Sequence, residues 1–313
     1  MVKDISFLIP AFNVERFLLE AVTSIINQAE VLDNFEIIIF DNCSTDNTFQ
    51  IAKKLEKDNP DVLRVFQNAE NRGPAFSLNR CWEKAIYDHT FLLHSDNAFY
   101  KSAIKNVMNY VNSPNYESGI VFGDIEYMDE DGEYMGQWFG DHLGVNKLDN
   151  EKLIHFYIDE NGSKFRPIQF FIDRTTFEKV GKYSEDYWLE DWEFTIRYLM
   201  AADFHRIPHV LVKFRENPNS LGHDPVKCGE SMLEVIHLHA NKLKSFIDLK
   251  LAYTNTAKRE LLMYIHRGWL FSGIRVLNTR FDQYELISKF SLFVFMAIEF
   301  SKFKIKQLLF TKS

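Results

Sequence analysis

Short apolar runs alternate with stretches of helical periodicity over the first hundred residues of the chain. Four runs are typical of strands: ISFLIP at 5–10, FEIIIFD at 35–41, VLRVFQN at 62–68 and TFLLHSD at 90–96. Between them, the sequence predicts helices over 17–26, 44–58 and 74–88. Strands separated by helices predict right-handed crossovers and an α/β fold with a Rossmann-like, mostly parallel central sheet flanked by helices.

The pattern changes twice further along the chain. Residues 119–138 alternate between apolar and polar around Asp131 and Gly132, which indicates a β-hairpin and adds antiparallel strands to the sheet. After about residue 225 the alternation ends and helical spacing takes over. We therefore expect a first domain over 1–225 and a helical C-terminal extension over 226–313.

Polar and turn-forming residues follow each of the four predicted strands. These segments are Pro10–Asn13, Asp41–Asp46, Asn68–Gly73 and His94–Asn97. In an open α/β sheet, ligands bind beyond the carboxyl ends of the strands. We expect the four segments to meet at one crevice on that edge.

Charge and cysteine content narrow the choice of partners. The chain has 36 basic and 44 acidic residues and a net charge of −8, so no overall positive field exists to hold nucleic acid through its phosphates. We expect no nucleic-acid partner. Cys43, Cys81 and Cys228 are too few and too scattered for a disulfide framework or a paired-thiolate zinc site, and they suit a reducing cytosol.

Neither end of the sequence has the pattern of a signal peptide or a membrane span. The N-terminal apolar run is short and lacks a small-residue cleavage site, which favours a first strand. Near the other end, the longest charge-free run is the nine residues Phe290–Ile298, and a span needs about 20. The C-terminal helices, with Lys302, Lys304 and Lys306, could lie on an anionic membrane surface or pack against the first domain or a second copy of the chain.

Two residues at the crevice suit a nucleotide. Asp41 could cap the following helix, or it could accept a hydrogen bond from a base imide or a ribose hydroxyl. Arg72 precedes Gly73 and Pro74, which mark a turn before a helix. Its guanidinium could pair with a diphosphate or stack on a base.

Asp96 is a candidate metal ligand. A carboxylate beside a diphosphate is what a hard divalent ion needs, because such an ion is held by one or two carboxylates together with substrate oxygens. The ion would offset the charge that builds on a leaving diphosphate. His94 could be a further ligand, or a buried and hydrogen-bonded histidine.

Glu190 and Asp191 begin a strongly helical segment, where acidic residues are ordinary partners of the helix dipole. As neighbours in sequence they point in different directions, so we expect one of them to face the crevice. A carboxylate there suits a general base acting on a hydroxyl nucleophile. The flanking rings of Trp188 and Trp192 could hold a sugar.

Taken in order, these segments resemble the inverting nucleotide-sugar glycosyltransferases of glycosyltransferase family 2, which have the GT-A fold. The resemblance is carried by SFLIPAFN, EIIIFDNCSTDNT, NRGPAFSLN, LLHSDNA and FEKVGKYSEDYWLEDWEF, followed by FRENPNS. It covers about residues 3–222. It implies a nucleotide-sugar half over about 1–100 and an acceptor half over about 101–225.

The resemblance also implies roles for single residues. Those that would contact the nucleotide are Pro10, Ala11, Phe12, Asp41, Arg72 and Ser95. Asp96 would hold Mn²⁺ or Mg²⁺ against the diphosphate, and Asp191 would be the base for in-line attack at the anomeric carbon. Residues in supporting positions are Glu190, His94, Asn97 and Arg215.

The activity implied is transfer of a sugar from a nucleotide diphosphate sugar to a hydroxyl of a glycan or lipid-linked acceptor, with inversion. A UDP-sugar is the expected donor, on the Asp41 interpretation and on family frequency. The expected setting is surface polysaccharide biosynthesis in the cytoplasm or at the inner face of the cell membrane.

The sequence departs from the family pattern at three positions. His94 stands at the first position of the Asp-x-Asp arrangement that many members carry, and Asn97 stands where another Asp is common. Asn217 replaces a histidine that is frequent in FRENPNS-like segments. These departures leave Asp96 as the one carboxylate of the motif and make metal dependence the first property to test.

Other classes of protein fit less well. A sugar-nucleotide pyrophosphorylase would carry a glycine-rich loop after the first strand, and IPAFNVE has no glycine. A Rossmann dehydrogenase would carry G-x-G-x-x-G, which is absent there. The remaining alternative is a non-catalytic protein that binds a sugar nucleotide or serves as a scaffold.

Overall fold

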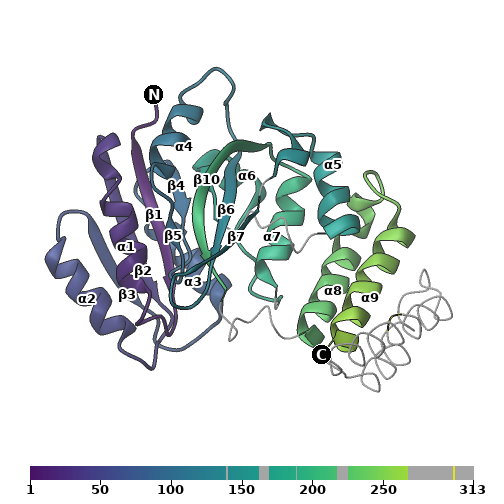
Figure 1. Cartoon of the computed structure of the whole chain (residues 1–313), viewed down its shortest axis with the longest axis horizontal. Helices are drawn as coiled ribbons and strands as arrows, with labels where there is room; N and C mark the ends of the chain where they lie inside the picture. The colour runs from purple at the N-terminus through teal and green to yellow at the C-terminus, as the bar shows by residue number, and fades with distance from the viewer. Residues whose placement is uncertain (139, 162–168, 188, 217–224, 267–298, 300–313) are drawn as a thin grey trace, which may run out of the picture.

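The computed structural model describes residues 1–138, 140–161, 169–187, 189–216, 225–266 and 299 (Figure 1). The strands are β1 (Asp4–Ala11), β2 (Asn34–Asp41), β3 (Leu63–Gln67), β4 (His89–Leu92), β5 (Ala98–Phe99), β6 (Ile120–Met128), β7 (Tyr134–Trp138), β8 (Asn146–Lys147), β9 (Phe171–Asp173) and β10 (Phe204–Arg215). The helices are α1 (Leu18–Ile26), α2 (Thr48–Asp58), α3 (Pro74–Lys84), α4 (Ala103–Val111), α5 (Asn150–His155), α6 (Arg174–Val180), α7 (Glu190–Leu199), α8 (Pro225–Leu243) and α9 (Leu249–His266). Short turns are η1 (Ala29–Val31), η2 (Asp141–Leu143) and the π-helical η3 (Phe156–Asn161).

The predicted strands and helices of the first hundred residues are all present. The helix expected over 44–58 begins later, at Thr48, because the residues before it bond to the loop after β1 instead. The Oγ of Ser44 accepts the Asn13 N–H at 2.9 Å, and the Asn47 N–H donates to the Glu15 carboxylate at 2.9 Å.

One sheet runs through the molecule in the order β3-β2-β1-β4-β9-β6-β10-β5, with β7 beside β6 and β8 beside β10. Neighbours among β3, β2, β1 and β4 are parallel, as predicted. In this half, Ala11 is in register with Asp41, and Asp41 with Gln67. The carboxyl ends of these three strands are therefore level, and the residues that follow them start from one edge.

The other half of the sheet is mixed. Strand β9 runs antiparallel to both β4 and β6, and β10 runs parallel to β6. Strands β6 and β7 form the predicted hairpin, whose turn holds Asp131 and Gly132. The α/β fold class is confirmed, with a parallel first half and a mixed second half.

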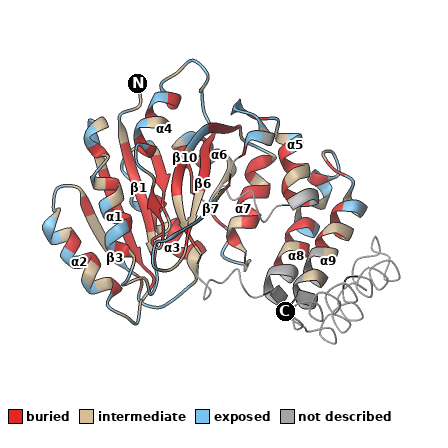
Figure 2. Ribbon diagram, viewed as in Figure 1, coloured by how far each residue is buried: buried red, intermediate tan, exposed pale blue. Residues whose placement is uncertain are grey.

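Each face of the sheet carries its own apolar core (Figure 2). Alternation along β1 sends Leu8 to the core under α3, α7, α8 and α9, and its neighbour Phe7 to the core under α1, α2 and α4. Side chains of both residues are fully buried. Helices thus cover both faces and leave the carboxyl edge to loops.

The C-terminal helices α8 and α9 pack together and against α7 and η3. Their buried Leu233, Ile236 and Tyr253 belong to the same core as the sheet residue Leu8. No helix in the described ranges is long and apolar enough to cross a membrane. The segment expected to contact a membrane or a second copy, residues 284–313, lies outside the described residues apart from Glu299, so both expectations stay predictions, as does the domain boundary near 225.

Candidate active site

The loops after β1 and β2 are tied together at the carboxyl edge. The Asn13 Oδ1 accepts the Thr45 N–H at 2.8 Å, and Asn13 adopts a left-handed φ of 51° that turns the chain toward this contact. Pro10 is half-buried, Ala11 is buried and Phe12 is 42% exposed. Phe12 is therefore the residue of this strand end with the most exposed side chain.

Asp41 is buried at the end of β2 inside a hydrogen-bond network. Its carboxylate accepts the Ser44 N–H at 3.1 Å, the Ser44 hydroxyl and the Gln67 amide at 2.9 Å. The first turn of α2 is served by Asp46, whose carboxylate accepts the Thr48 N–H at 2.9 Å. Asp41 thus fixes the loop, and the expected helix-capping contact comes from Asp46.

Arg72 lies at the crevice edge with a half-exposed side chain. Its guanidinium is 4.0 Å from the centroid of the Phe76 ring and 3.5 Å from a carboxylate oxygen of Glu185. The loop around it is held by Asn42, whose side chain accepts the Arg72 N–H at 3.2 Å and donates to the Gly73 carbonyl at 3.1 Å. The guanidinium can leave its exposed partner for an anionic ligand at small cost.

Strand β4 ends at Leu92, so the residues after it form a turn and do not alternate as a strand would. The Asn97 N–H donates to the His94 carbonyl at 3.0 Å and closes this turn. Ser95 and Asn97 are buried, whereas His94 and Asp96 are half-buried. Burial raises the pKa of the Asp96 carboxyl, and the charges of His94 and Arg215 partly oppose that rise.

Arg215, at the end of β10, donates hydrogen bonds to the turn at residues 94–97. Its main-chain N–H donates to the Asn97 Oδ1 at 2.7 Å, and its Nε donates to the Asp96 carbonyl at 3.0 Å. The same guanidinium donates to the carbonyls of Asp129 and Glu130 and to the Glu20 carboxylate. Arg215 is buried and donates to the main-chain carbonyl of Asp96, so it fixes the main chain that carries the Asp96 carboxylate.

Glu190 and Asp191 form the first turn of α7 and meet His94 in one small hollow. Glu190 is buried, and burial, followed by the charge of Asp191, raises the pKa of Glu190 to about 8. Asp191 is half-buried, and its Oδ1 accepts the Trp192 N–H at 2.8 Å. The predicted base and the turn that carries the predicted metal ligand therefore face each other.

The segment that leads into α7 is anchored on two sides, by a side chain of α3 and by a side chain of α8. Asn79 of α3 donates to the Tyr183 carbonyl and accepts the Tyr183 N–H, both at 3.0 Å. On the other side, the Leu189 N–H donates to the Ser231 Oγ of α8 at 3.0 Å. These contacts fix where α7 starts and hence where Asp191 lies.

The sugar contact predicted for the Trp192 ring is wrong. Trp192 is buried and stacks on Tyr157, with ring centroids 4.4 Å apart, so it fills the core and offers no surface to a sugar. Trp188 and Asn217 lie outside the described residues.

The donor groups at the turn fit a divalent ion only in part. Among the described residues, no group of three or more His, Cys, Asp or Glu side chains comes together as a metal site. Asp96 offers one carboxylate, and the His94 side chain is near enough to lower its pKa. This set suits a hard cation that takes its remaining ligands from a bound diphosphate.

Comparisons with known proteins identify the family and the fold of the chain. The family model Glycosyl transferase family 2 matches residues 6–183, more than half of the chain. Minor teichoic acid biosynthesis protein GgaA of Bacillus subtilis (strain 168) is 27% identical over 187 residues, which are 58% of this chain and 41% of GgaA. The chain spans about a fifth to two fifths of the length of the curated relatives that it matches.

Solved structures share the fold at low identity. Residues 1–349 of TarS from S. aureus, in complex with UDP-GlcNAc, align with a TM-score of 0.58 and 15% identity over 98% of this chain and 92% of that one. The mannosyltransferase PcManGT from Pyrobaculum calidifontis, in complex with GDP-Man and Mn²⁺, aligns with a TM-score of 0.54 and 14% identity over 95% and 86%. The fold is therefore GT-A, and the chain belongs to glycosyl transferase family 2.

Proposed function

We propose that this glycosyltransferase moves a sugar from a UDP-sugar to a hydroxyl of a glycan or lipid-linked acceptor, with inversion at the anomeric carbon. The observation that carries the proposal is the meeting of Glu190 and Asp191 with His94 in one hollow, beside the turn that holds Asp96. A base and a diphosphate site on one edge are what direct displacement requires.

The donor half of the edge would hold the nucleotide. Residues proposed to contact it are Pro10, Ala11, Phe12, Asp41, Arg72 and Ser95. Asp96, with His94 beside it, would hold Mn²⁺ or Mg²⁺, which would offset the charge on the leaving diphosphate. Arg72 can turn from Glu185 to the diphosphate because its side chain is 49% exposed.

Asp191 would accept the proton of the acceptor hydroxyl while that oxygen forms a bond to the anomeric carbon. The bond from that carbon to the diphosphate breaks on the opposite side, and the electron pair leaves with the nucleoside diphosphate. Burial and the neighbouring carboxylate raise the pKa of Glu190 to about 8, so Glu190 would hold a proton at neutral pH and leave Asp191 to act as the base. The protonated Glu190 can donate a hydrogen bond to the acceptor.

The names of similar proteins support a UDP-sugar as the donor and surface polysaccharide biosynthesis as the setting. TarS was solved with UDP-GlcNAc, and GgaA is named for minor teichoic acid biosynthesis. We infer that this chain builds a surface polysaccharide in the cytoplasm or at the inner face of the cell membrane.

The test is a donor-cleavage and transfer assay of the full chain with a panel of nucleotide sugars. We expect turnover with a UDP-sugar and a loss of about 10²–10⁴-fold in Asp191→Asn, with donor affinity kept. Asp186→Asn, an exposed carboxylate in the segment before α7, is the matched control. Full activity of Asp191→Asn would remove the assigned base, and donor binding without turnover in the wild type would favour the non-catalytic alternative.

A further inference from the structure

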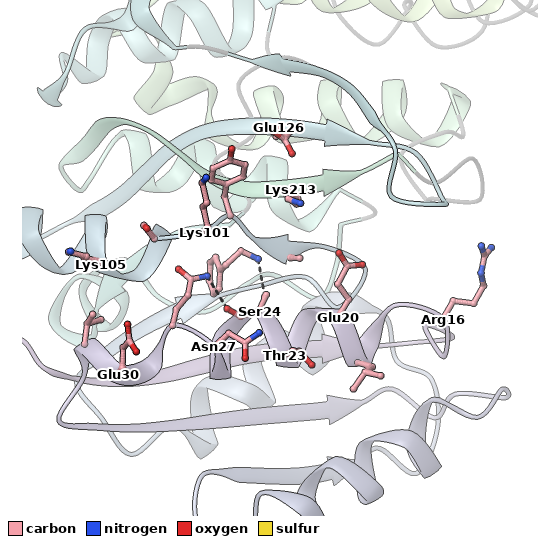
Figure 3. A pocket seen from close by; sticks show the side chains of 17 residues that line it. Arg16, Glu20, Thr23, Ser24, Asn27, Glu30, Lys101, Lys105, Glu126 and Lys213 are labelled. Atoms are coloured by element: carbon pink, nitrogen blue, oxygen red, sulfur yellow. Dashed lines mark hydrogen bonds between the residues drawn. The ribbon is translucent and has the colours of Figure 1, made fainter.

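A second hollow lies on the face of the sheet opposite α7. It has a volume of about 860 Å³ and is formed by α1, the segment from β5 into α4, and single side chains of β6 and β10 (Figure 3). Ligand pockets commonly have volumes of about 300–1,000 Å³, so it is large enough for several sugar units. The candidate active site does not use it, because Asp191 and Glu190 lie across the sheet.

Three lysines give this groove its charge. Lys101, Lys105 and Lys213 line it, and none of the three forms an ion pair with any residue that the structure describes. Three acidic residues also line the wall: Glu20 accepts from Arg215, Glu126 accepts from the Gln137 amide at 3.2 Å, and Glu30 is an exposed residue of η1. In a chain of net charge −8, this leaves ammonium groups available to a negatively charged ligand.

The rest of the lining suits a sugar. Thr23 of α1 and Asn27, which directly follows this helix, line the groove with a hydroxyl and an amide (Figure 3). Tyr100 adds an aromatic ring to the lining. Within the described ranges, neither the Thr23 hydroxyl nor the Asn27 amide makes a hydrogen bond. Hydroxyl, amide and ring surfaces together match the hydroxyls and C–H faces of a saccharide.

The groove connects with the candidate metal turn. Its floor, β5, starts directly after Asn97, and its wall residue Glu20 accepts from Arg215, which donates to the Asp96 carbonyl. Arg16, at one end of the groove, belongs to the loop that follows β1. A chain lying in the groove would therefore end near the carboxyl edge of the sheet.

We propose that this groove binds an anionic segment of the acceptor glycan, through its carboxylate or phosphate groups. The inference rests on the proposed transferase function and names the acceptor class: a glycan that carries negative charge along its chain. Charge-assisted contacts from Lys101, Lys105 and Lys213 hold the acid groups, and the α1 side chains contact the sugars.

Binding is measured on the full chain with three probes of equal length. These are an oligogalacturonate hexamer, a glycerol phosphate hexamer and neutral maltohexaose. The first two separate carboxylate from phosphate recognition. We expect at least one anionic probe to bind, to weaken as salt is raised, and to bind more tightly than maltohexaose.

The variants Lys101→Gln/Lys105→Gln and Lys213→Gln should each weaken that binding about tenfold. The control variant Lys54→Gln/Lys57→Gln on α2 removes two charges from exposed lysines outside the groove and should leave the binding unchanged. Equal loss in this control, equal binding of maltohexaose, or no binding of either anionic probe would overturn the inference.

Donor cleavage without acceptor separates this inference from the proposed function. We expect the groove variants to cleave a UDP-sugar at the wild-type rate, because their lysines lie outside the donor site. A wild type that binds an anionic probe but cleaves no donor contradicts the transferase proposal and leaves the groove as a glycan site. Loss of donor cleavage in the groove variants would assign the lysines to the donor site and end the inference.

Discussion

Glu190 is buried at the start of α7, next to a second carboxylate. The pKa of the Glu190 carboxyl is raised, so the folded chain keeps the carboxyl proton at pH values at which the unfolded chain has released it. The contribution of Glu190 to stability is therefore fully present below its ordinary pKa of 4.5 and is lost as the pH rises to about 8. In the proposed mechanism, this proton would leave Asp191 to act as the base of the pair.

A glutamine at this position is neutral at every pH. Glu190→Gln should therefore gain free energy of unfolding over the wild type as the pH rises from about 5 to about 9, by on the order of 2–4 kcal/mol. Urea unfolding at both pH values measures this difference. Glu178→Gln, an exposed carboxyl on α6, is the control and should show no such trend. An equal difference at both pH values would show that Glu190 ionises normally.

At the scale of single residues, the sequence predicted the candidate site residues that come directly after a strand. Asp41 and Asp96 come after apolar runs, and parallel strands place those ends together. The side-chain partners of Asn42 and Gln67 were not predicted, because a single loop or strand amide carries no sign of its partner. Register could have identified Gln67, since it is level with Asp41 across β2 and β3.

Two arginines of different burial contact the turn of the β6–β7 hairpin, and one of them also contacts the candidate metal turn. Arg215 is buried and donates to the carbonyls of Asp129 and Glu130. Arg16 pairs with the carboxylates of Glu130 and Asp131, but its side chain is 56% exposed. The two contacts reach the same turn, and only the buried one also reaches the Asp96 main chain.

Lysine keeps the charge of Arg215 but lacks its fork of donors. Arg215→Lys should lower the free energy of unfolding by about 2–4 kcal/mol and raise the Mn²⁺ concentration that gives half-maximal donor cleavage. Arg16→Lys is matched in chemistry and touches the same turn, and it should cost less than about 1 kcal/mol and leave the metal response unchanged. Calorimetry and a Mn²⁺ titration give both readouts. Equal metal responses in the two variants would contradict a positioning role for Arg215.

The parallel half of the sheet was predictable because its strands are separated by single amphipathic helices. Strand β9 was not, because Phe171–Asp173 is too short to show any period, although it lies in the middle of the sheet between β4 and β6. Its place depends on contacts distant in sequence, such as the Asp173 carboxylate, which accepts the Gly119 N–H at 2.8 Å. Local pattern carries no information of that kind.

At the scale of the whole molecule, α8 and α9 share a core with the catalytic sheet. A chain truncated before Pro225 would expose the apolar residues of α7 and η3 that these helices cover. We expect the truncated chain to aggregate, or to unfold more than about 10 °C below the wild type. A chain ending after His266 keeps both helices and is the control. Thermal unfolding and size-exclusion chromatography compare the two truncated chains. Equal melting temperatures of these two chains would show that α8 and α9 are a separate unit.

The hydrogen bond from the Leu189 N–H to the Ser231 Oγ lets α8 help to position Glu190 and the proposed base Asp191. Leu189 directly precedes Glu190, so a displacement of α8 would shift the start of α7 as well. Recombination that exchanged the C-terminal helices between related enzymes would then shift the position of the proposed base Asp191, although the exchanged segment does not contain it. We expect the two parts of this chain to be inherited together.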